Sequence, residues 1–205
     1  MADLIFYTNP MSRGRIARWM LEEVGAPYET VLVDWQDKPQ ALLDANPLGK
    51  VPTIVHRGQV VSEAAAICLY LADAFPDARL APTDAERADY YRWTLFCAGP
   101  LEAAVTDKSL GVMVPPDRRA MVGYGSLDEA IATLAWAVGR HAYIAGDRFT
   151  AADVYVGSAV GWFTQFGILP KEGPFADYLA RVAGRPAAVR AREIDDALLP
   201  KHQPA

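Results

Sequence analysis

The stretch that decides the fold of this chain is Leu4–Val33, LIFYTNPMSRGRIARWMLEEVGAPYETVLV. It opens with the apolar, β-prone residues 4–8, which predict a buried strand. Asn9-Pro10 ends this strand, because both residues favour turns. A valine-rich run, residues 28–33, closes the stretch and predicts a second strand.

A helix is predicted between these strands, over about residues 13–24. Ile16, Met20 and Val24 are four positions apart and form one apolar face. Ser12 is a good residue to cap the start of this helix. A strand, a helix and a strand in so short a stretch predict a βαβ unit with parallel strands.

The following segments extend this unit to the order of the thioredoxin-like fold. A weaker helical stretch covers residues 38–44. Runs 53–56 and 59–61 flank Arg57-Gly58 and predict a β-hairpin. A long apolar helix is predicted over 62–75, which completes the order βαβ, α, ββα.

A second, all-helical domain is predicted after a linker. We expect a thioredoxin-like domain at residues 1–76, a linker at 77–84 and a helical domain at 85–205. The linker region holds two prolines, Pro76 and Pro82, and few large side chains, and no clear strand pattern follows it. The predicted helices of the second domain cover 85–110, 118–140 with Asp117 as cap, 151–166, 175–182 and 186–194.

Thr150-Ala-Ala-Asp153 is a capping-box pattern at the start of one of these helices. Phe149 and Val154 stand at the positions of a hydrophobic staple. We therefore expect Asp153 to be important for folding rather than for catalysis.

Composition and charge exclude several classes of function. Apolar residues make up 52% of the chain and charged residues 22%, which is ordinary globular composition. A net charge of −5 disfavours broad nucleic-acid binding. Cys68 and Cys97 form no CxxC pair and no His/Cys ligand spacing, so no metal site is expected. Without a signal-peptide pattern or a membrane-length apolar run, we expect a cytoplasmic protein.

The chain contains four distinctive segments: FYTNPMSRGRIARWMLEEVG (6–25), NPLGKVPTIV (46–55), VVSEAAAICLYLAD (60–73) and AGDRFTAADVYVGSAV (145–160). They resemble the cytosolic glutathione transferase family, in the style of bacterial members related to the theta and beta groupings. They occur in the family's order and span nearly the whole chain. The resemblance implies a glutathione-binding domain followed by a substrate-pocket domain, glutathione as co-substrate and a homodimer.

Glutathione conjugation needs a thiolate, and a free thiol with a pKa of about 8.5 is mostly protonated at neutral pH. A hydrogen-bond donor and positive potential favour the anion. The resemblance implies that the Ser12 hydroxyl is this donor, in a Ser-x-x-Arg arrangement with Arg15. Tyr7 is the alternative, because some members use a tyrosine at the end of the first strand. Beta-like members carry a cysteine where Ser12 stands, so its absence disfavours mixed-disulfide chemistry.

The resemblance also assigns the contacts with the rest of the tripeptide. Val51-Pro52 matches the family's cis-proline, whose preceding residue pairs with the cysteinyl backbone. Glu63 matches the acid that receives the γ-glutamyl amine. Ala64 departs from the family, which usually has a serine there, and one lost hydrogen bond to a charged group costs about 1.5–3 kcal/mol. Candidates for the glycine carboxylate, all of which also fit solvated surface side chains, are Arg13, Gln36, Lys38 and Lys50.

The electrophile pocket is weakly specified by the sequence. The resemblance suggests five wall residues, each of which also fits a core or surface position: Phe96, Gly99, Glu102, Met113 and Trp162. The resulting prediction is a glutathione transferase that acts on small hydrophobic electrophiles and has no metal, nucleic-acid or membrane partner. The alternative is a non-catalytic or weakly glutathione-binding member of the same fold, which Ala64 favours.

Overall fold

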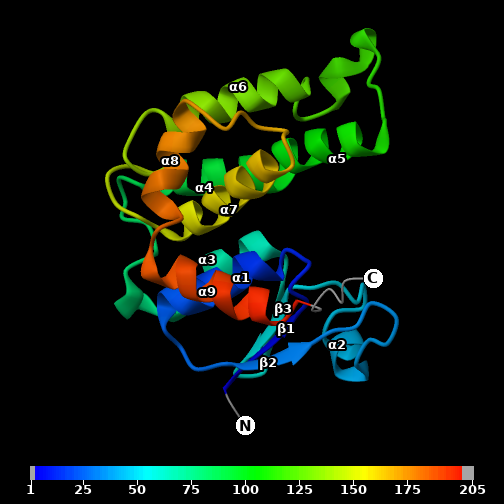
Figure 1. Cartoon of the computed structure of the whole chain (residues 1–205), viewed down its shortest axis with the longest axis vertical. Coiled ribbons are helices and arrows are strands. Elements are labelled where there is room, and N and C mark those ends of the chain that lie inside the picture. The colour runs from blue at the N-terminus through cyan, green and yellow to red at the C-terminus, as the bar shows by residue number, and fades with distance from the viewer. Residues whose placement is uncertain (1–2, 200–205) are drawn as a thin grey trace, which may run out of the picture. The chain divides into compact units, whose positions relative to one another are not determined.

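The computed structural model describes residues 3–199 of the chain and divides it into two compact units (Figure 1). One unit runs to Ala81 and resumes at Gly184, and the other is Pro82–Ala183. The predicted boundaries put every residue after 84 in the second domain. The structure instead groups the last helix with the first unit, because that helix packs along the first helix of the chain.

A four-stranded sheet forms the centre of the first unit. Its strands are β1 (Leu4–Thr8), β2 (Glu29–Leu32), β3 (Thr53–His56) and β4 (Gln59–Ser62), in the order β2-β1-β3-β4. β1 runs parallel to β2 and antiparallel to β3, and β3 and β4 form the hairpin. The predicted βαβ unit and hairpin are thereby confirmed.

Helices cover both faces of this sheet. They are α1 (Gly14–Val24), α2 (Gln40–Ala45), α3 (Ala64–Ala74) and α9 (Pro186–Ala197), with a 3-10 turn at Pro76–Ala78. On one face, the guanidinium of Arg18 in α1 lies 5.2 Å from the ring centre of Phe6. On the other face, Leu42 of α2 packs in a core cluster with Tyr7 and Val33. Neighbouring residues of β1 therefore face different helices, as alternation along a strand requires.

The second unit, which is described throughout, is helical apart from an isolated bridge between Tyr143 and Gly146. A thioredoxin-like unit and an all-helical unit confirm the predicted fold class. The helices are α4 (Arg87–Phe96), α5 (Glu102–Leu110), α6 (Leu127–Val138), α7 (Ala151–Gln165) and α8 (Pro174–Val182), with a π segment at Cys97–Leu101 and a 3-10 helix at Pro116–Met121.

Two predicted helices differ from the structure. The predicted helix over 85–110 is continuous in path, but Pro100 lies in the π segment between α4 and α5. Proline has no N–H to donate and its ring clashes with the carbonyl four residues earlier, so a wider turn accommodates it.

The predicted helix over 118–140 is wrong in its first half. Asp117 lies in the first turn of a 3-10 helix, and α6 begins only at Leu127. Gly125 adopts a φ of +67°, which interrupts helical backbone. Ser126 then caps α6, because its hydroxyl accepts a hydrogen bond from the N–H of Glu129 at 3.2 Å.

The capping box before α7 is present and is buried. The N–H and the hydroxyl of Thr150 donate to one carboxylate oxygen of Asp153, at 2.9 and 3.0 Å. The other oxygen accepts hydrogen bonds from the Ile144 N–H and the Tyr178 hydroxyl, both at 2.8 Å. Burial raises the pKa of the Asp153 carboxyl, and these donors act in the opposite direction. Asp153 thus ties three segments of the unit together.

We predict that Asp153→Ala lowers the free energy of unfolding by about 3 kcal/mol or more, because it removes a cap and leaves several buried donors unpaired. Thermal and urea unfolding measure this. Asp128→Ala is the control, since Asp128 is an exposed acid in the first turn of α6, and its effect should stay within about 0.5 kcal/mol. An Asp153→Ala protein that melts like the unaltered chain would show that the box is dispensable.

Candidate functional site

The loop between β1 and α1 is fixed by the side chain of Asn9. Its amide nitrogen donates to the Val33 carbonyl at 2.9 Å, which ties the loop to the strand next to β1. Its amide oxygen accepts a hydrogen bond from the Met11 N–H at 2.8 Å, a local turn that asparagine favours. The loop therefore leaves the sheet in a defined direction.

Ser12 lies half-buried in this loop, two residues before α1. Its hydroxyl donates to the Asn9 carbonyl at 2.7 Å and accepts from the Gly14 N–H at 2.9 Å. Arg13, rather than Ser12, takes the capping position, which corrects the predicted cap. The hydroxyl nevertheless lies at the amino end of α1, where unpaired N–H groups and the helix dipole favour an anion.

Gly14 allows α1 to start very close to β1. A Cβ atom at this position would lie 2.0 Å from the Thr8 hydroxyl oxygen and 3.0 Å from that of Ser12. Any other residue would displace one of these side chains, so glycine is required by the close approach. Neither Thr8 nor Gly14 was among the predicted site residues, although a glycine two positions after the candidate cap Ser12 was a usable signal.

Arg15 reaches back over the loop. Its Nε donates to the Pro10 carbonyl at 2.6 Å, and its Nη2 forms an ion pair of 2.7 Å with Asp196 of α9. Arg15 therefore holds the carbonyl two residues before Ser12. Arg15 in the first turn of α1 is thus hydrogen-bonded to the loop that carries Ser12, which links the two residues of the predicted Ser-x-x-Arg arrangement.

Tyr7, the alternative thiolate donor, is buried at the end of β1. Its ring belongs to the core cluster with Val33 and Leu42, and the half-buried Val51 and Val55 pack against this cluster. The ring thus has a packing role that accounts for its position.

The turn before β3 contains a cis peptide bond between Val51 and Pro52, as the resemblance implies. Asn46 and Thr53 brace this turn, because both side chains donate to the Lys50 carbonyl, at 3.2 and 2.9 Å. Within residues 3–199, neither main-chain polar group of Val51 has a hydrogen-bond partner. Both groups are therefore available to an extended peptide.

Glu63 precedes α3 in an unusual backbone conformation. Its φ of 68° and ψ of 118° lie in a sparsely populated region for a residue with a side chain. Such a conformation costs about 1–3 kcal/mol and is found mainly at functional sites. The side chain of Glu63 is exposed, and the buried Ala64 is the first residue of α3.

The candidate side chains for the glycine carboxylate lie in three loops of this unit. Lys38 packs against Gly49, since a Cβ on Gly49 would lie 3.1 Å from its Nζ. Lys38 is therefore next to the turn that carries Lys50 and Val51. Lys50 and Gln36 are exposed, and Arg13 is exposed in the Ser12 loop.

The five predicted wall residues all lie in the second unit. Phe96 ends α4 and packs edge-on against Trp93 at 5.7 Å. Trp162 in α7 is partly exposed and packs against Phe166 at 5.0 Å. Met113 is 90% exposed in the loop after α5. The remaining two are Gly99 of the π segment and Glu102 at the start of α5.

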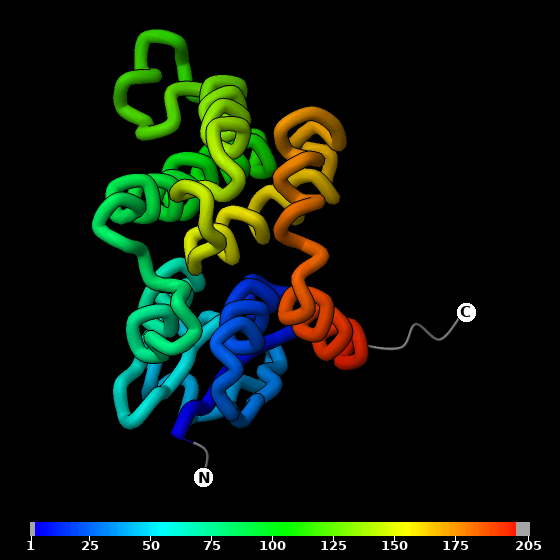
Figure 2. The backbone as a smooth tube through the Cα atoms, turned by 90° about the vertical axis from the view of Figure 1, so that its left-hand side faces the viewer, coloured from blue at the N-terminus to red at the C-terminus, as the bar shows by residue number. Residues whose placement is uncertain are grey.

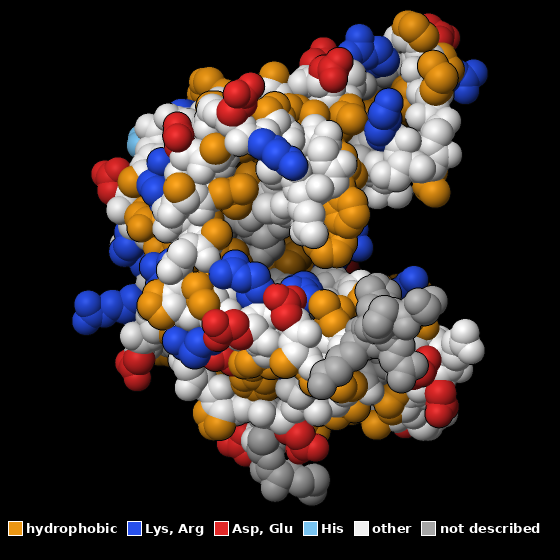
Figure 3. All heavy atoms as spheres, in the orientation of Figure 1, with side chains coloured by type: hydrophobic (Ala, Val, Ile, Leu, Met, Phe, Trp, Pro, Cys, Tyr) orange, Lys and Arg blue, Asp and Glu red, His pale blue; other side chains and the backbone are white. Residues whose placement is uncertain are grey.

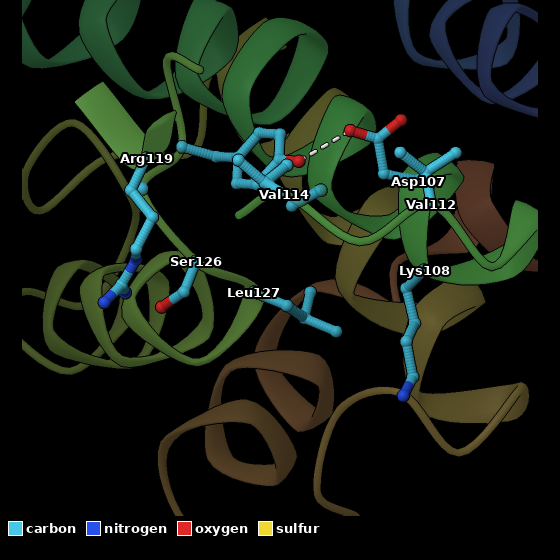
Figure 4. Close-up of a pocket in the computed structure, with 10 residues that line it drawn as sticks. Asp107, Lys108, Val112, Val114, Arg119, Ser126 and Leu127 are labelled. Carbon is cyan, nitrogen blue, oxygen red and sulfur yellow. Dashed lines mark hydrogen bonds between the residues drawn. The ribbon is translucent and has the colours of Figure 1, made fainter. Parts of the chain in front are cut away.

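A cavity of about 180 Å³ lies between the end of α5 and the start of α6. Figure 4 shows Arg119 and Lys108 on opposite sides of it, with Leu127 between them. Tyr124 donates to Asp107, and Arg119 pairs with Glu129 at 2.8 Å, so these polar groups satisfy one another. None of the five predicted wall residues lines this cavity.

Two kinds of site are absent from the part of the chain that the structure describes. It contains no group of three or more His, Cys, Asp or Glu residues arranged to hold a metal ion. None of its helices has the length and apolar character needed to cross a membrane.

Comparisons with known proteins show which family this chain is similar to. The profile of the glutathione S-transferase N-terminal domain matches residues 11–74. Glutathione S-transferase GstA of Escherichia coli O157:H7 is 30% identical over 187 residues, which are 87% of this chain and 89% of the relative. A probable glutathione S-transferase of rice, GSTU6, is 30% identical over 72% of this chain, and the match spans 66% of the rice protein.

A solved structure of a glutathione S-transferase is also similar to this chain. The theta class glutathione S-transferase of Xanthomonas axonopodis pv. citri, with glutathione bound, superposes with a TM-score of 0.70 and 28% identity, covering 93% of this chain and 97% of that one. Together with the E. coli relative, this likeness covers both units of the fold. The chain belongs to the glutathione S-transferase family.

Proposed function

We propose that this protein is a glutathione transferase in which the Ser12 hydroxyl stabilises the thiolate of bound glutathione. The observation that carries the proposal is the position of this hydroxyl at the amino end of α1, in a loop fixed by Asn9 and Arg15. The glutathione bound to the Xanthomonas relative supports the choice of ligand. The packing of Tyr7 in the core favours Ser12 over Tyr7 as the donor.

The chemistry needs little movement of the protein. In the proposed complex, the Ser12 hydroxyl turns its hydrogen from the Asn9 carbonyl to the sulfur and keeps the hydrogen bond from the Gly14 N–H. This second hydrogen bond polarises the hydroxyl and makes it a better donor. The thiolate then attacks a carbon of the electrophile and forms a carbon–sulfur bond. In a substitution the leaving group departs with the bonding electron pair, and in an addition the neighbouring atom takes up a proton.

The remaining contacts of the tripeptide follow from the same unit. The main chain of Val51, unpaired among the described residues, would pair with the cysteinyl backbone. The Glu63 carboxylate would receive the γ-glutamyl amine, and the Ala64 N–H at the start of α3 would hold the γ-glutamyl carboxylate. Lys38 and Lys50 flank the Val51 turn and, with Arg13, would face the glycine carboxylate.

The electrophile is proposed to be small and hydrophobic and to contact Phe96, Gly99, Glu102, Met113 and Trp162. A cytoplasmic location is part of the same proposal. A second candidate function is a binding protein without transferase activity. Ala64 favours it, because the hydroxyl that usually holds the γ-glutamyl carboxylate is missing.

We predict that Ser12→Ala lowers kcat/KM with a chlorinated nitrobenzene about 10²- to 10³-fold, the usual cost of removing one donor to a developing or held anion. The pKa of the bound thiol should rise, which the ultraviolet absorbance of the thiolate measures across a pH series. Tyr7→Phe is the matched variant, since it also removes one hydroxyl. A large loss in Tyr7→Phe with unchanged kinetics in Ser12→Ala would transfer the role to Tyr7.

Ala64→Ser should tighten glutathione binding about ten-fold, because it restores one hydrogen bond to a charged group. Titration calorimetry measures the dissociation constant. Ala66→Ser makes the same change at an exposed position of α3 and should have no effect. Binding heat in both proteins without any turnover would favour the binding-protein alternative, and the absence of binding heat would refute glutathione as the ligand.

A homodimer is also proposed from the family resemblance. Tyr91 and Leu95 of α4 and Trp136 of α6 are exposed apolar side chains of the second unit that such an assembly would cover. Sedimentation equilibrium should give twice the chain mass, and Leu95→Glu should shift the protein toward the monomer. A monomer at micromolar concentration would contradict this part of the proposal.

A further inference from the structure

Helices α1 and α9 lie side by side within the first unit and are joined by ion pairs along their length (Figures 1 and 2). Basic and acidic side chains lie close together over α9 (Figure 3). The order of the partners is antiparallel, so the start of α1 meets the end of α9. The pairs are Arg15–Asp196, Arg18–Asp195, Glu22–Arg190 and Glu23–Arg185, at 2.7, 2.7, 3.2 and 2.7 Å.

Each helix alone carries its charges in the unfavourable order. α1 has Arg15 and Arg18 in its first half and Glu22 and Glu23 at its end, and its first turn has no acid. α9 has no acid in its first turn and no base in its last. Because the helix dipole favours the opposite arrangement, the charges are stabilised by the neighbouring helix rather than by their own.

The centre of the contact is the pair Arg18–Asp195, in which both side chains are 1% exposed. Arg18 also donates to the Tyr28 hydroxyl at 3.1 Å and stacks over Phe6. The guanidinium is thus held between β1, β2 and α9. This arrangement fixes the position of α1 along its axis and around it.

The outer pair reaches the Ser12 loop. Asp196 binds Nη2 of Arg15, and Nε of the same guanidinium donates to the Pro10 carbonyl. The Arg15 guanidinium is rigid and planar and is bound at two of its nitrogens. A displacement of Asp196 would therefore also displace the Pro10 carbonyl. α9 is therefore connected to the loop through one side chain.

We propose that Asp196 is a positioning residue for the thiolate site: through Arg15, it holds the Pro10–Ser12 turn in the geometry in which the Ser12 hydroxyl meets the sulfur. Asp195 supports the same site by holding α1 itself. Helix α9, which follows the second unit along the chain, thus supports the proposed glutathione site of the first unit. This inference rests on the proposed role of Ser12.

The test uses Asp196→Ala in the full chain, with Glu193→Ala as control. Both substitutions remove one acid from the exposed side of α9, but Glu193 pairs with no residue in the described ranges. Asp196→Ala should lower kcat/KM about ten-fold, because small displacements of a catalytic group are costly. Glu193→Ala should leave it unchanged. Asp195→Ala is less suitable, since an unpaired buried guanidinium threatens folding itself.

The direction in which Asp196→Ala shifts the pKa of the bound thiol shows whether Asp196 positions the Ser12 loop or acts only through its negative charge. Removing a nearby negative charge favours the thiolate and lowers the pKa of the bound thiol. Loss of the hydroxyl's alignment instead raises it, and we expect a rise of about half a unit or more in Asp196→Ala. Asp196→Asn keeps an acceptor oxygen for Arg15 and should restore most of the activity. A lowered or unchanged pKa in Asp196→Ala would overturn the proposal.

Two further measurements test whether Asp196 acts through Arg15 and whether it holds the loop that carries Ser12. Arg15→Ala/Asp196→Ala should be no slower than Arg15→Ala alone, since both act through one guanidinium. Additive losses would mean that Asp196 acts by another route. Hydrogen exchange of residues 11–15 should accelerate in Asp196→Ala even without glutathione. Should the wild type fail to bind glutathione, the proposed function falls, whereas unchanged exchange in Asp196→Ala would refute the positioning alone.

Discussion

The buried ion pair between Arg18 and Asp195 is the constraint on which the first unit depends. Burial raises the pKa of the Asp195 carboxyl, and the nearby Arg18 opposes this. Two charges at 1% exposure gain little overall stability from each other, because both have lost their hydration. They do raise the free energy of any other packing of α9 on α1, since separating the two side chains leaves a buried charge without a partner. The pair therefore specifies one position of α9 on α1 more than it adds stability.

The position of α1 in turn decides where the Ser12 loop lies. Gly14 brings the helix against Thr8 of β1 so closely that a Cβ atom has no room. Asn9 ties the other side of the loop to β2 through the Val33 carbonyl. The loop is thus held by the sheet at one end and by the first helix at the other, with Arg15 across it. The hydroxyl oxygen is therefore in place before any ligand arrives and only its hydrogen has to turn, which favours electrostatic stabilisation of an anion.

Sequence patterns predicted the local structure well and the long-range structure less well. The βαβ unit, the hairpin and the Thr150–Asp153 box each depend on residues close together in the chain, and all are present. The helix over 118–140 was misjudged because Gly125 interrupts the helical backbone and Ser126, rather than Asp117, caps α6. The location of α9 was missed because its partners lie about 180 positions away, beyond any periodicity. Its reversed charge order was nevertheless visible in the sequence.

The strained backbone at Glu63 lies where the proposed glutathione site lacks the serine hydroxyl. The N–H groups in the first turn of α3 belong to the main chain, so they do not depend on the side chain of Ala64. The cis turn at Val51 likewise offers main-chain groups. Because backbone donors survive side-chain substitution, the proposed site loses affinity at Ala64 without losing its geometry. The sequence departure therefore bears on how tightly glutathione binds more than on whether the thiolate can form.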